Sequence, residues 1–325
     1  MTSFTEPFER LDAEQIRPLL NAVYGIEIVG TPIRLPTERD DTYRVATRTG
    51  DGYVVKVAHP GDHPRIVDLQ VAAMIHVGRR DPRLPLERIL CAVDGQRQPS
   101  VEMRDGRRRI MRVTTFLPGR TLRSVEPSPG QLRQCGQVLA RMANALNDFD
   151  HEAADRHLMF DLQNFGELAA MRRLSDTPAV RWVFDWFESV FQSAAAELPK
   201  QVVHGDFSLD NILVDPVADT FVQGVLDWGD VMRSWRAADL ASGLASQVAA
   251  NGDAWERPRH MIDGYREECE MTDAESGLIR GLVSMRITQR LLMALHLSAA
   301  MPDNAEYLSR NVEWSAAQLS NLVDA

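Results

Sequence analysis

The stretch that decides the fold is Val203-His-Gly-Asp-Phe-Ser-Leu-Asp-Asn-Ile-Leu-Val214, followed after a polar hairpin by Gly224-Val-Leu-Asp-Trp-Gly-Asp230. Asp206 stands five residues before Asn211, and Asp227 ends the next apolar strand. The apolar runs around these residues predict a strand, a loop and a second strand. We therefore expect the three oxygen-bearing side chains to meet in one site.

These residue types suit phosphoryl transfer. Such a reaction needs an acceptor hydroxyl oriented in line and a divalent metal that bridges the phosphates of the donor. Asp206 is the predicted catalytic base, which orients the hydroxyl and accepts its proton. The hard oxygen atoms of Asn211 and Asp227 suit magnesium rather than a transition metal.

The composition is that of an ordinary globular chain. Its 325 residues are 44% hydrophobic and 25% charged, enough for about two domains. A net charge of −10 argues against binding to nucleic acid. No apolar stretch approaches the length of a membrane span and no basic-then-apolar segment opens the chain, so we expect a cytoplasmic protein. Three widely spaced cysteines predict buried, reduced thiols: Cys91, Cys135 and Cys269.

The first third of the chain predicts a helix followed by a mostly antiparallel sheet. Asp51-Gly52 and Asp105-Gly106 are typical of hairpin turns. The predicted helices cover 12–24 and 62–77, and the predicted strands cover 43–46, 53–57, 89–93, 99–103 and 109–115.

Beyond Phe116-Leu117-Pro118-Gly119 the pattern becomes mainly helical. We place the boundary near residue 115, with an N-terminal nucleotide-binding lobe over 1–115 and a C-terminal catalytic and substrate lobe over 116–325. The expected fold class is therefore α+β. Helices are predicted over 128–147, 180–195, 236–249, 254–268, 273–300 and 304–322.

Lys56 is the candidate for contact with the nucleotide phosphates. It is flanked by valines in Tyr53-Val-Val-Lys-Val57, so it points away from its apolar neighbours. In kinases such a lysine also pairs with an acidic residue on the next helix, for which Asp68 is the candidate and Gln70 the alternative. A surface lysine on an edge strand is the competing interpretation.

The loop 35–42, before the lysine strand, holds no glycine, unlike the Gly-x-Gly-x-x-Gly loop of protein kinases. Its backbone N–H groups and Arg39 are candidates for phosphate contacts, and a plain polar loop is the alternative. Further along the chain, His204 is expected to lock the loop that carries Asp206. Asp239 is expected to bond that loop from the helix behind it, with an exposed helical aspartate as the alternative. Asp230 could hold a second metal, face the substrate or cap the following helix.

The His-Gly-Asp-x-x-x-x-Asn loop and the Leu-Asp-Trp-Gly-Asp turn resemble the aminoglycoside phosphotransferase superfamily, small-molecule relatives of protein kinases. Within it the chain is most similar to hydroxylysine kinases. The similar stretches run nearly from end to end: 35–41, 66–70, 116–120, 224–230 and 285–289.

This resemblance implies a protein-kinase-like fold of two lobes, an N-lobe with an antiparallel sheet plus helix and a mainly helical C-lobe. It implies that Lys56 contacts the phosphates and that backbone groups near Thr115 to Leu117 hold the nucleotide base. Arg286 and Gln289 are candidates for the acceptor pocket, with a helix-surface arginine as the alternative. Hydroxylysine kinases use GTP, so ATP and GTP both stay open as donors.

We predict a Mg²⁺-dependent phosphotransferase with an alcohol group as acceptor. It would transfer the γ-phosphoryl group of ATP or GTP to a small amine-bearing molecule, with hydroxylysine or a related hydroxy-amino acid as the leading candidate. One alternative is an antibiotic phosphotransferase that confers resistance, and another is a non-catalytic nucleotide-binding protein, against which the intact Lys56, Asp206, Asn211 and Asp227 argue. A protein kinase is rejected because no room remains after Asp230 for an activation segment. The oligomeric state stays open, a homodimer included.

Overall fold

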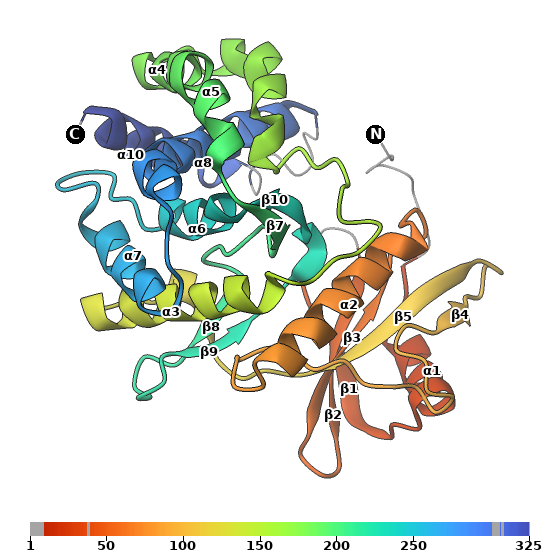
Figure 1. Ribbon diagram of the computed structural model, residues 1–325. Helices are drawn as coiled ribbons and strands as arrows, with labels where there is room; N and C mark the ends of the chain where they lie inside the picture. Colours follow the sequence, from red (N-terminus) through yellow and green to blue (C-terminus); the bar gives the residue numbers. More distant parts are fainter. Residues whose placement is uncertain (1–9, 38–39, 301–305, 307–308, 325) are drawn as a thin grey trace. The chain divides into compact units, whose positions relative to one another are not determined.

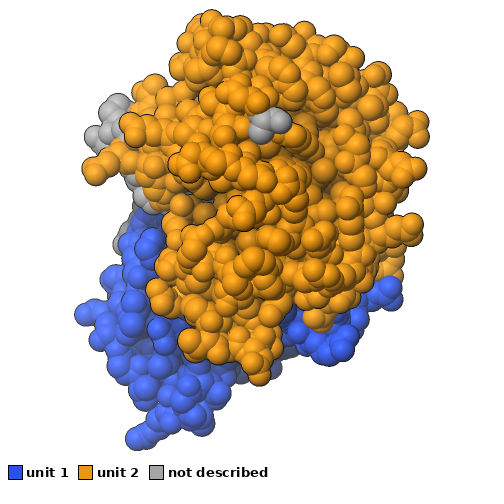
Figure 2. Space-filling view, turned by 90° about the vertical axis from the view of Figure 1, so that its left-hand side faces the viewer, with its two compact units in different colours: residues 1–119, 151–153 blue, residues 120–150, 154–325 orange. Residues whose placement is uncertain are grey.

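The computed structural model describes residues 10–37, 40–300, 306 and 309–324. The chain forms two compact units, coloured separately in Figure 2. Unit 1 is Met1–Gly119 with His151–Ala153, and unit 2 is Arg120–Asp150 with Ala154–Ala325.

Unit 1 is built on a five-stranded antiparallel sheet in the order β1-β2-β3-β5-β4 (Figure 1). The helix α1 covers part of it, because Ile16, Leu20 and Tyr24 share a buried core with Val55 and Val113 of the sheet. The elements of unit 1 are α1 (Ala13–Tyr24), β1 (Ile28–Arg34), β2 (Asp41–Thr47), β3 (Gly52–Val57), α2 (Pro64–Arg80), β4 (Ser100–Glu102) and β5 (Arg108–Thr115).

The first helix begins and ends as its sequence predicts. Asp12 and Gln15 form a reciprocal capping box at its start. Gly25 ends it in the left-handed conformation with φ 65°. These local signals explain why the predicted helix bounds agree with the structure.

Two predictions about the sheet were wrong. The strand β1 was missed, because Gly30 and Pro32 interrupt its sequence and its pairing with β2 shifts register between Val29 and Ile33. The predicted strand 89–93 is reduced to an isolated bridge between Ile89 and Thr114.

Unit 2 is mainly helical and holds two small sheets, β10-β7 and β6-β8-β9. Its helices are α3 (Pro129–Leu146), α4 (Pro178–Trp186), α5 (Gln192–Ala194), α6 (Arg236–Ala245), α7 (Glu256–Glu268), α8 (Asp273–Ala300) and α10 (Val312–Asp324). Its strands are β6 (Arg120–Thr121), β7 (Lys200–Val203), β8 (Ile212–Val214), β9 (Val222–Val225) and β10 (Met232–Trp235). Segments of other helix types are η1 (Leu122–Ser124), η2 (Leu162–Leu174), η3 (Phe187–Phe191), η4 (Ala195–Glu197) and η5 (Trp228–Asp230).

Several helix predictions for unit 2 need correction. The predicted helix 180–195 is divided, since the π-helical turn η3 separates α4 from α5. The segment η2 was not predicted because it has no helical periodicity. The last predicted helix includes α10 from Val312, Glu306 and Ser309 are also helical, and residue 304 lies outside the described residues.

Cys135 and Cys269 are buried as predicted, but Cys91 is exposed. Within the described ranges, no helix combines the length and the apolar character needed to cross a membrane.

Candidate active site

Two strand pairs bring the polar residues of unit 2 together. At the end of β7, Val203 lies opposite Met232 of β10. Just beyond the β8–β9 pair, the N–H of Leu226 donates to the carbonyl of Asn211 over 2.8 Å. The loop after β7, called the catalytic loop below (residues 204–211), and the turn after β9 therefore lie side by side.

Gly205 allows this close approach. It has φ +88°, and a Cβ atom at this position would collide with the carbonyl oxygen of Asp230. Only glycine adopts such a backbone without strain and without a side chain in the way. The contact fixes the catalytic loop against the turn that carries Asp227 and Asp230.

Asp239 holds the catalytic loop from α6, as predicted. Its Oδ1 accepts the N–H of Gly205 over 2.8 Å and its Oδ2 accepts the N–H of His204 over 3.1 Å. Burial raises the pKa of Asp239, although His204 and these two backbone donors lower it. Both oxygens of this buried carboxylate are thus satisfied by the loop.

His204 also locks the loop, as predicted. Its Nε2 donates to the carbonyl of Leu226 over 3.1 Å, and its Nδ1 accepts the N–H of Asp206 over 3.4 Å. Because a carbonyl only accepts, this geometry assigns the proton to Nε2. The buried ring of Trp228 meets the imidazole edge-on at 5.1 Å.

Asp206 keeps 29% of its side-chain surface exposed and has three partners. The guanidinium of Arg286 donates to its Oδ1 over 3.2 Å. Its Oδ2 accepts the amide of Asn211 over 2.7 Å and the hydroxyl of Ser208 over 3.2 Å. The carboxylate is therefore oriented from both sides while part of it stays accessible.

Asn211 and Asp227 offer oxygen atoms that fit magnesium. The amide nitrogen of Asn211 is used by Asp206, so its Oδ1 faces no hydrogen-bond donor among the described residues. Asp227 sits in the left-handed region with φ 61°, and its Oδ1 accepts the N–H of Gly229 over 3.1 Å. The described ranges hold no group of three or more His, Cys, Asp or Glu side chains able to enclose a metal. Magnesium with one or two protein ligands and several waters requires no such enclosure.

Asp230 lies beside these residues. Burial and the nearby Asp206 and Asp227 raise the pKa of Asp230 to about 7, while Arg286 and Arg156 act in the opposite direction. The nearest cation is the guanidinium of Arg156, 3.9 Å from Oδ1. The predicted capping role is wrong, since Trp235 precedes α6 without any side-chain cap. The negative charges of Asp206 and Asp227 act on Asp230, and a cation bound near them would relieve this repulsion.

Arg286 and Gln289 project from α8. Arg286 contacts Asp206 and also donates to the carbonyl of Phe160 over 2.8 Å. Gln289 is fully buried, accepts from Arg286 over 2.9 Å and donates to the carbonyl of Met159 over 2.8 Å. Gln289 thus supports Arg286, and its place in the acceptor pocket stays a prediction.

In unit 1, Lys56 lies on β3 between Thr42 of β2 and Arg112 of β5. It is half-buried on an interior strand, which excludes the competing interpretation of an edge-strand lysine. The predicted ion pair with Asp68 is not found among the described contacts. Asp68 instead accepts from Gln98 and from Nε2 of His151.

The backbone near Thr115 is only partly available to a ligand. The N–H of Thr115 donates to the carbonyl of Arg88 over 3.0 Å, and the N–H of Phe116 donates to Gly52 over 2.9 Å. No hydrogen bond of Leu117 occurs among the described residues. Leu117 and Thr115 were both predicted to bind the nucleotide base. The backbone N–H of Leu117 is therefore available to a ligand, whereas that of Thr115 is not.

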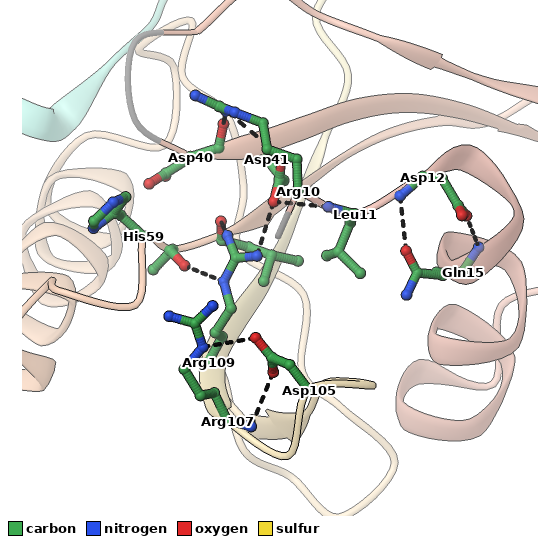
Figure 3. Close-up of polar contacts among 12 residues, drawn as sticks. Arg10, Leu11, Asp12, Gln15, Asp40, Asp41, His59, Asp105, Arg107 and Arg109 are labelled. Atoms are coloured by element: carbon green, nitrogen blue, oxygen red, sulfur yellow. Dashed lines mark hydrogen bonds and ion pairs between the residues drawn. The ribbon is translucent and has the colours of Figure 1, made fainter. Parts of the chain in front are cut away.

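The loop 35–42 is anchored at its ends, and Glu38 and Arg39 lie outside the described residues. The N–H of Leu35 donates to the carbonyl of Thr42 over 2.9 Å. Figure 3 shows the fully buried Asp41, whose Oδ2 accepts Nη1 of Arg109 over 2.8 Å and the N–H of Leu11 over 3.2 Å.

Two residues of the site escaped the sequence prediction. Arg156 donates to the carbonyl of Gly229 over 2.6 Å, but it lies in a stretch without periodicity that gave no signal. Ser208 lies inside the quoted motif, two residues after Asp206, where a hydroxyl commonly bonds a nearby carboxylate.

A sequence profile of the phosphotransferase enzyme family matches residues 31–269, a range that includes Lys56 and the whole catalytic loop. The chain belongs to this phosphotransferase family. It is also 23% identical to the hydroxylysine kinase of Mus musculus, over 95% of this chain and 89% of that protein.

Solved structures of phosphotransferases share the fold. The microcompartment-associated aminopropanol kinase aligns with a TM-score of 0.71 at 17% identity, covering 96% of this chain and 97% of that chain. Amicoumacin kinase, solved with AMP-PNP and Ca²⁺, aligns with a TM-score of 0.68 at 14% identity, covering 94% of each chain. The predicted superfamily, the kinase-like α+β fold and the assignment as a small-molecule phosphotransferase are confirmed.

Proposed function

We propose that this phosphotransferase transfers the γ-phosphoryl group of ATP or GTP to a hydroxyl group of a hydroxy-amino acid, with hydroxylysine as the leading candidate. The observation that carries the proposal is the arrangement of Asp206, Asn211, Asp227 and Asp230 on one loop and one turn of unit 2. It is the set of groups that phosphoryl transfer to an alcohol requires.

Asp206 would orient the acceptor hydroxyl and accept its proton. Its contacts with Arg286 and Asn211 support this role, because they hold the carboxylate in one orientation. Its remaining exposure leaves room for a ligand atom. In a loose transition state this positioning contributes more than the basicity of the carboxylate.

Asn211 and Asp227 would hold Mg²⁺, with Asp230 as a further carboxylate nearby. The bound ion would neutralise the charge on the donor phosphates. The unused Oδ1 of Asn211 and the concentration of negative charge around Asp230 support a cation at this place. A structural relative is compatible with a bound cation, since amicoumacin kinase was solved with Ca²⁺ and a nucleotide analogue.

Unit 1 would bind the nucleotide. The half-buried Lys56 on an interior strand supports a phosphate contact, and the unused backbone N–H of Leu117 supports a contact with the base. The backbone of the anchored loop 35–42 is a second candidate for phosphate contacts. Asp68 has other partners, so it would orient His151 rather than Lys56.

The match to hydroxylysine kinase, which extends over nearly the full length of both proteins, supports the proposed acceptor class. The structural matches include an antibiotic kinase and an aminopropanol kinase, so they do not favour one acceptor. The antibiotic phosphotransferase interpretation is therefore the runner-up.

A coupled assay of nucleoside diphosphate release tests the proposal. ATP and GTP are each supplied with Mg²⁺ and with hydroxylysine, homoserine, aminopropanol or an aminoglycoside. We expect turnover with hydroxylysine or homoserine and little turnover with the aminoglycoside. If only the aminoglycoside is phosphorylated, the antibiotic interpretation replaces the proposal. If no acceptor stimulates release, the proposed acceptor class is wrong.

A further inference from the structure

Arg290 is a half-buried cation without an acidic partner among the described residues. It lies on α8, where its Nε donates to the hydroxyl of Ser315 over 3.0 Å and its Nη2 to Oε1 of Gln318 over 2.6 Å. Its guanidinium also lies 4.8 Å from the ring centroid of Trp314. All of these partners are neutral, and no carboxylate contacts Arg290 among the described residues.

The neighbouring arginines differ in this respect. Arg286, one helical turn earlier, pairs with Asp206. Arg123 binds both oxygens of Asp210 over 2.6 Å and 2.7 Å, and Arg310 lies 3.5 Å from the same carboxylate. Arg290 alone of these four arginines has no carboxylate within ion-pair distance among the described residues.

The electrostatic environment of Arg290 favours the binding of an anion. Burial, Arg286 and Arg123 lower the pKa of Arg290 to about 9, and only Asp206 opposes them. The side chain still carries its charge at neutral pH. A half-buried charge without a counter-ion within ion-pair distance attracts an anionic group.

The spacing of Arg290 and Arg286 along α8 relates Arg290 to the proposed catalytic base, Asp206. It follows Arg286 by one turn of α8, a rise of about 6 Å along the helix axis. Arg286 contacts Asp206, where the acceptor hydroxyl would bind. A short hydroxy-amino acid could therefore place its hydroxyl at Asp206 and its carboxylate toward Arg290.

We propose that Arg290 binds the carboxylate of the acceptor and so makes the enzyme specific for hydroxy-amino acids over the corresponding amino alcohols. This inference rests on the proposed function, because it assumes that Asp206 receives the acceptor hydroxyl. The same positive charge would disfavour a polycationic aminoglycoside, which would meet a guanidinium where it needs an acidic group.

The test compares hydroxylysine with its decarboxylated amino alcohol, using the wild-type protein, Arg290→Gln and Arg290→Lys. The wild type is expected to prefer hydroxylysine. Arg290→Gln should raise the KM for hydroxylysine about 10- to 100-fold, the usual effect of losing a charged hydrogen bond. Its KM for the amino alcohol and for the nucleotide should change little. Arg290→Lys should recover part of the preference, because it keeps the charge.

Two controls separate this role from a purely structural one. Ser315→Ala removes a hydrogen bond of Arg290 but keeps its charge, so it should retain the preference for hydroxylysine. Arg280→Gln removes another arginine of α8, which donates to the carbonyl of Leu322, and should leave the KM values unchanged. Arg290 would be only a packing residue if Arg290→Gln raised the KM of both acceptors equally.

The wild-type protein separates the two proposals without any variant. Equal efficiency on hydroxylysine and on the amino alcohol would overturn the role of Arg290 and leave the phosphotransferase function standing. A protein that phosphorylates neither compound would overturn the proposed acceptor class and, with it, the role of Arg290.

Discussion

The guanidinium of Arg286 reaches from α8 to the carboxylate of Asp206, with 3.2 Å between Nη2 and Oδ1. The same group donates from Nη1 to the carbonyl of Phe160 and to the side chain of Gln289. Arg286 therefore connects the catalytic loop to a segment more than forty residues earlier in the chain. A planar guanidinium can make these bonds together, whereas a lysine ammonium carries its donors on a single atom.

Arg286→Lys is expected to lower kcat by about 100-fold. The substitution would let the carboxylate of Asp206 shift, and a displacement of about 1 Å at a catalytic group lowers the rate by roughly this factor. The KM for the nucleotide should change little, since the substitution leaves Lys56 and Asp227 intact. Steady-state kinetics with saturating nucleotide measures both values. Arg280→Lys on the same helix is the matched control and should behave as wild type. An unchanged kcat for Arg286→Lys would show that this contact does not position Asp206.

Asp206→Ala and Asp227→Ala should separate catalysis from binding. Without Asp206, we expect turnover to fall by about 100- to 10,000-fold, the usual range for a lost general base, while affinity for the magnesium nucleotide stays near that of wild type. Without Asp227, the affinity itself should fall, since a proposed metal ligand is gone. Calorimetric titration with a non-hydrolysable nucleotide and Mg²⁺ measures the affinity.

The exposed Asp219 in the β8–β9 hairpin supplies the control for this pair, because Asp219→Ala removes a carboxylate outside the site. The assignment of the base is wrong if Asp206→Ala retains turnover within a few-fold of wild type. The assignment of the metal ligand is wrong if Asp227→Ala binds the magnesium nucleotide normally.

Gly205→Ala is expected to destabilise the protein by more than about 2 kcal/mol. Alanine would be strained in the left-handed backbone conformation, and its Cβ would also collide with Asp230, so the two energetic costs add. Activity should fall as well, since the collision would separate the catalytic loop from the turn. Thermal unfolding and kinetics measure the two effects. Gly277→Ala in α8 is the control, because its surroundings are open and alanine favours a helix. Wild-type stability of Gly205→Ala would refute the close approach.

The sequence predicted the parts of the site that are formed by neighbours in the chain. Asp206 and Asn211 belong to one loop, and the apolar strands around them define where that loop begins and ends. The bond from Asp239 to the loop was also predicted, because a lone aspartate in the apolar start of a helix needs a polar partner.

Contacts between distant segments could not be predicted in the same way. Arg156 reaches the site through tertiary packing, which no local pattern encodes, and Arg286 was indicated only by the resemblance, without its contact to Asp206. Asp68 was assigned to Lys56 by analogy, but Gln98 and His151 compete for it from segments whose positions the sequence did not reveal. The strand β1 was missed because its pairing with β2 overrides the turn signals of Gly30 and Pro32.

Asp239→Asn should destabilise the protein by about 1–3 kcal/mol, the cost of an unsatisfied buried donor. Both oxygens of Asp239 accept backbone N–H groups, so the amide nitrogen of asparagine would face a donor instead of an acceptor. Denaturant unfolding measures the loss. Asp263→Asn, at an exposed position of α7, should change stability by less than about 0.5 kcal/mol. Equal effects of the two substitutions would exclude the proposed role of Asp239.

Asp230 should make the stability of the metal-free protein depend on pH near neutrality. Burial, followed by Asp206 and Asp227, raises the pKa of Asp230 to about 7, whereas an unfolded aspartate titrates near about 4. Between these values the folded protein holds a proton that the unfolded chain releases. The contribution of Asp230 to the free energy of unfolding is therefore most favourable at low pH and is lost as the pH rises through about 7. The side chain is 33% exposed, so water weakens the effect without changing its sign.

Thermal unfolding in a chelator, from about pH 5 to pH 8, measures this dependence. Asp230→Asn cannot titrate, so its Tm should fall less steeply across this range than that of wild type. Asp253→Asn is the control, because hydrogen bonds from Trp255 and Arg259 lower the pKa of Asp253 and place its titration below the range. Parallel curves for wild type and Asp230→Asn would mean that Asp230 is ionised throughout. In that case the repulsion among the three carboxylates, which supports a cation at this site, would be weaker than the structure implies.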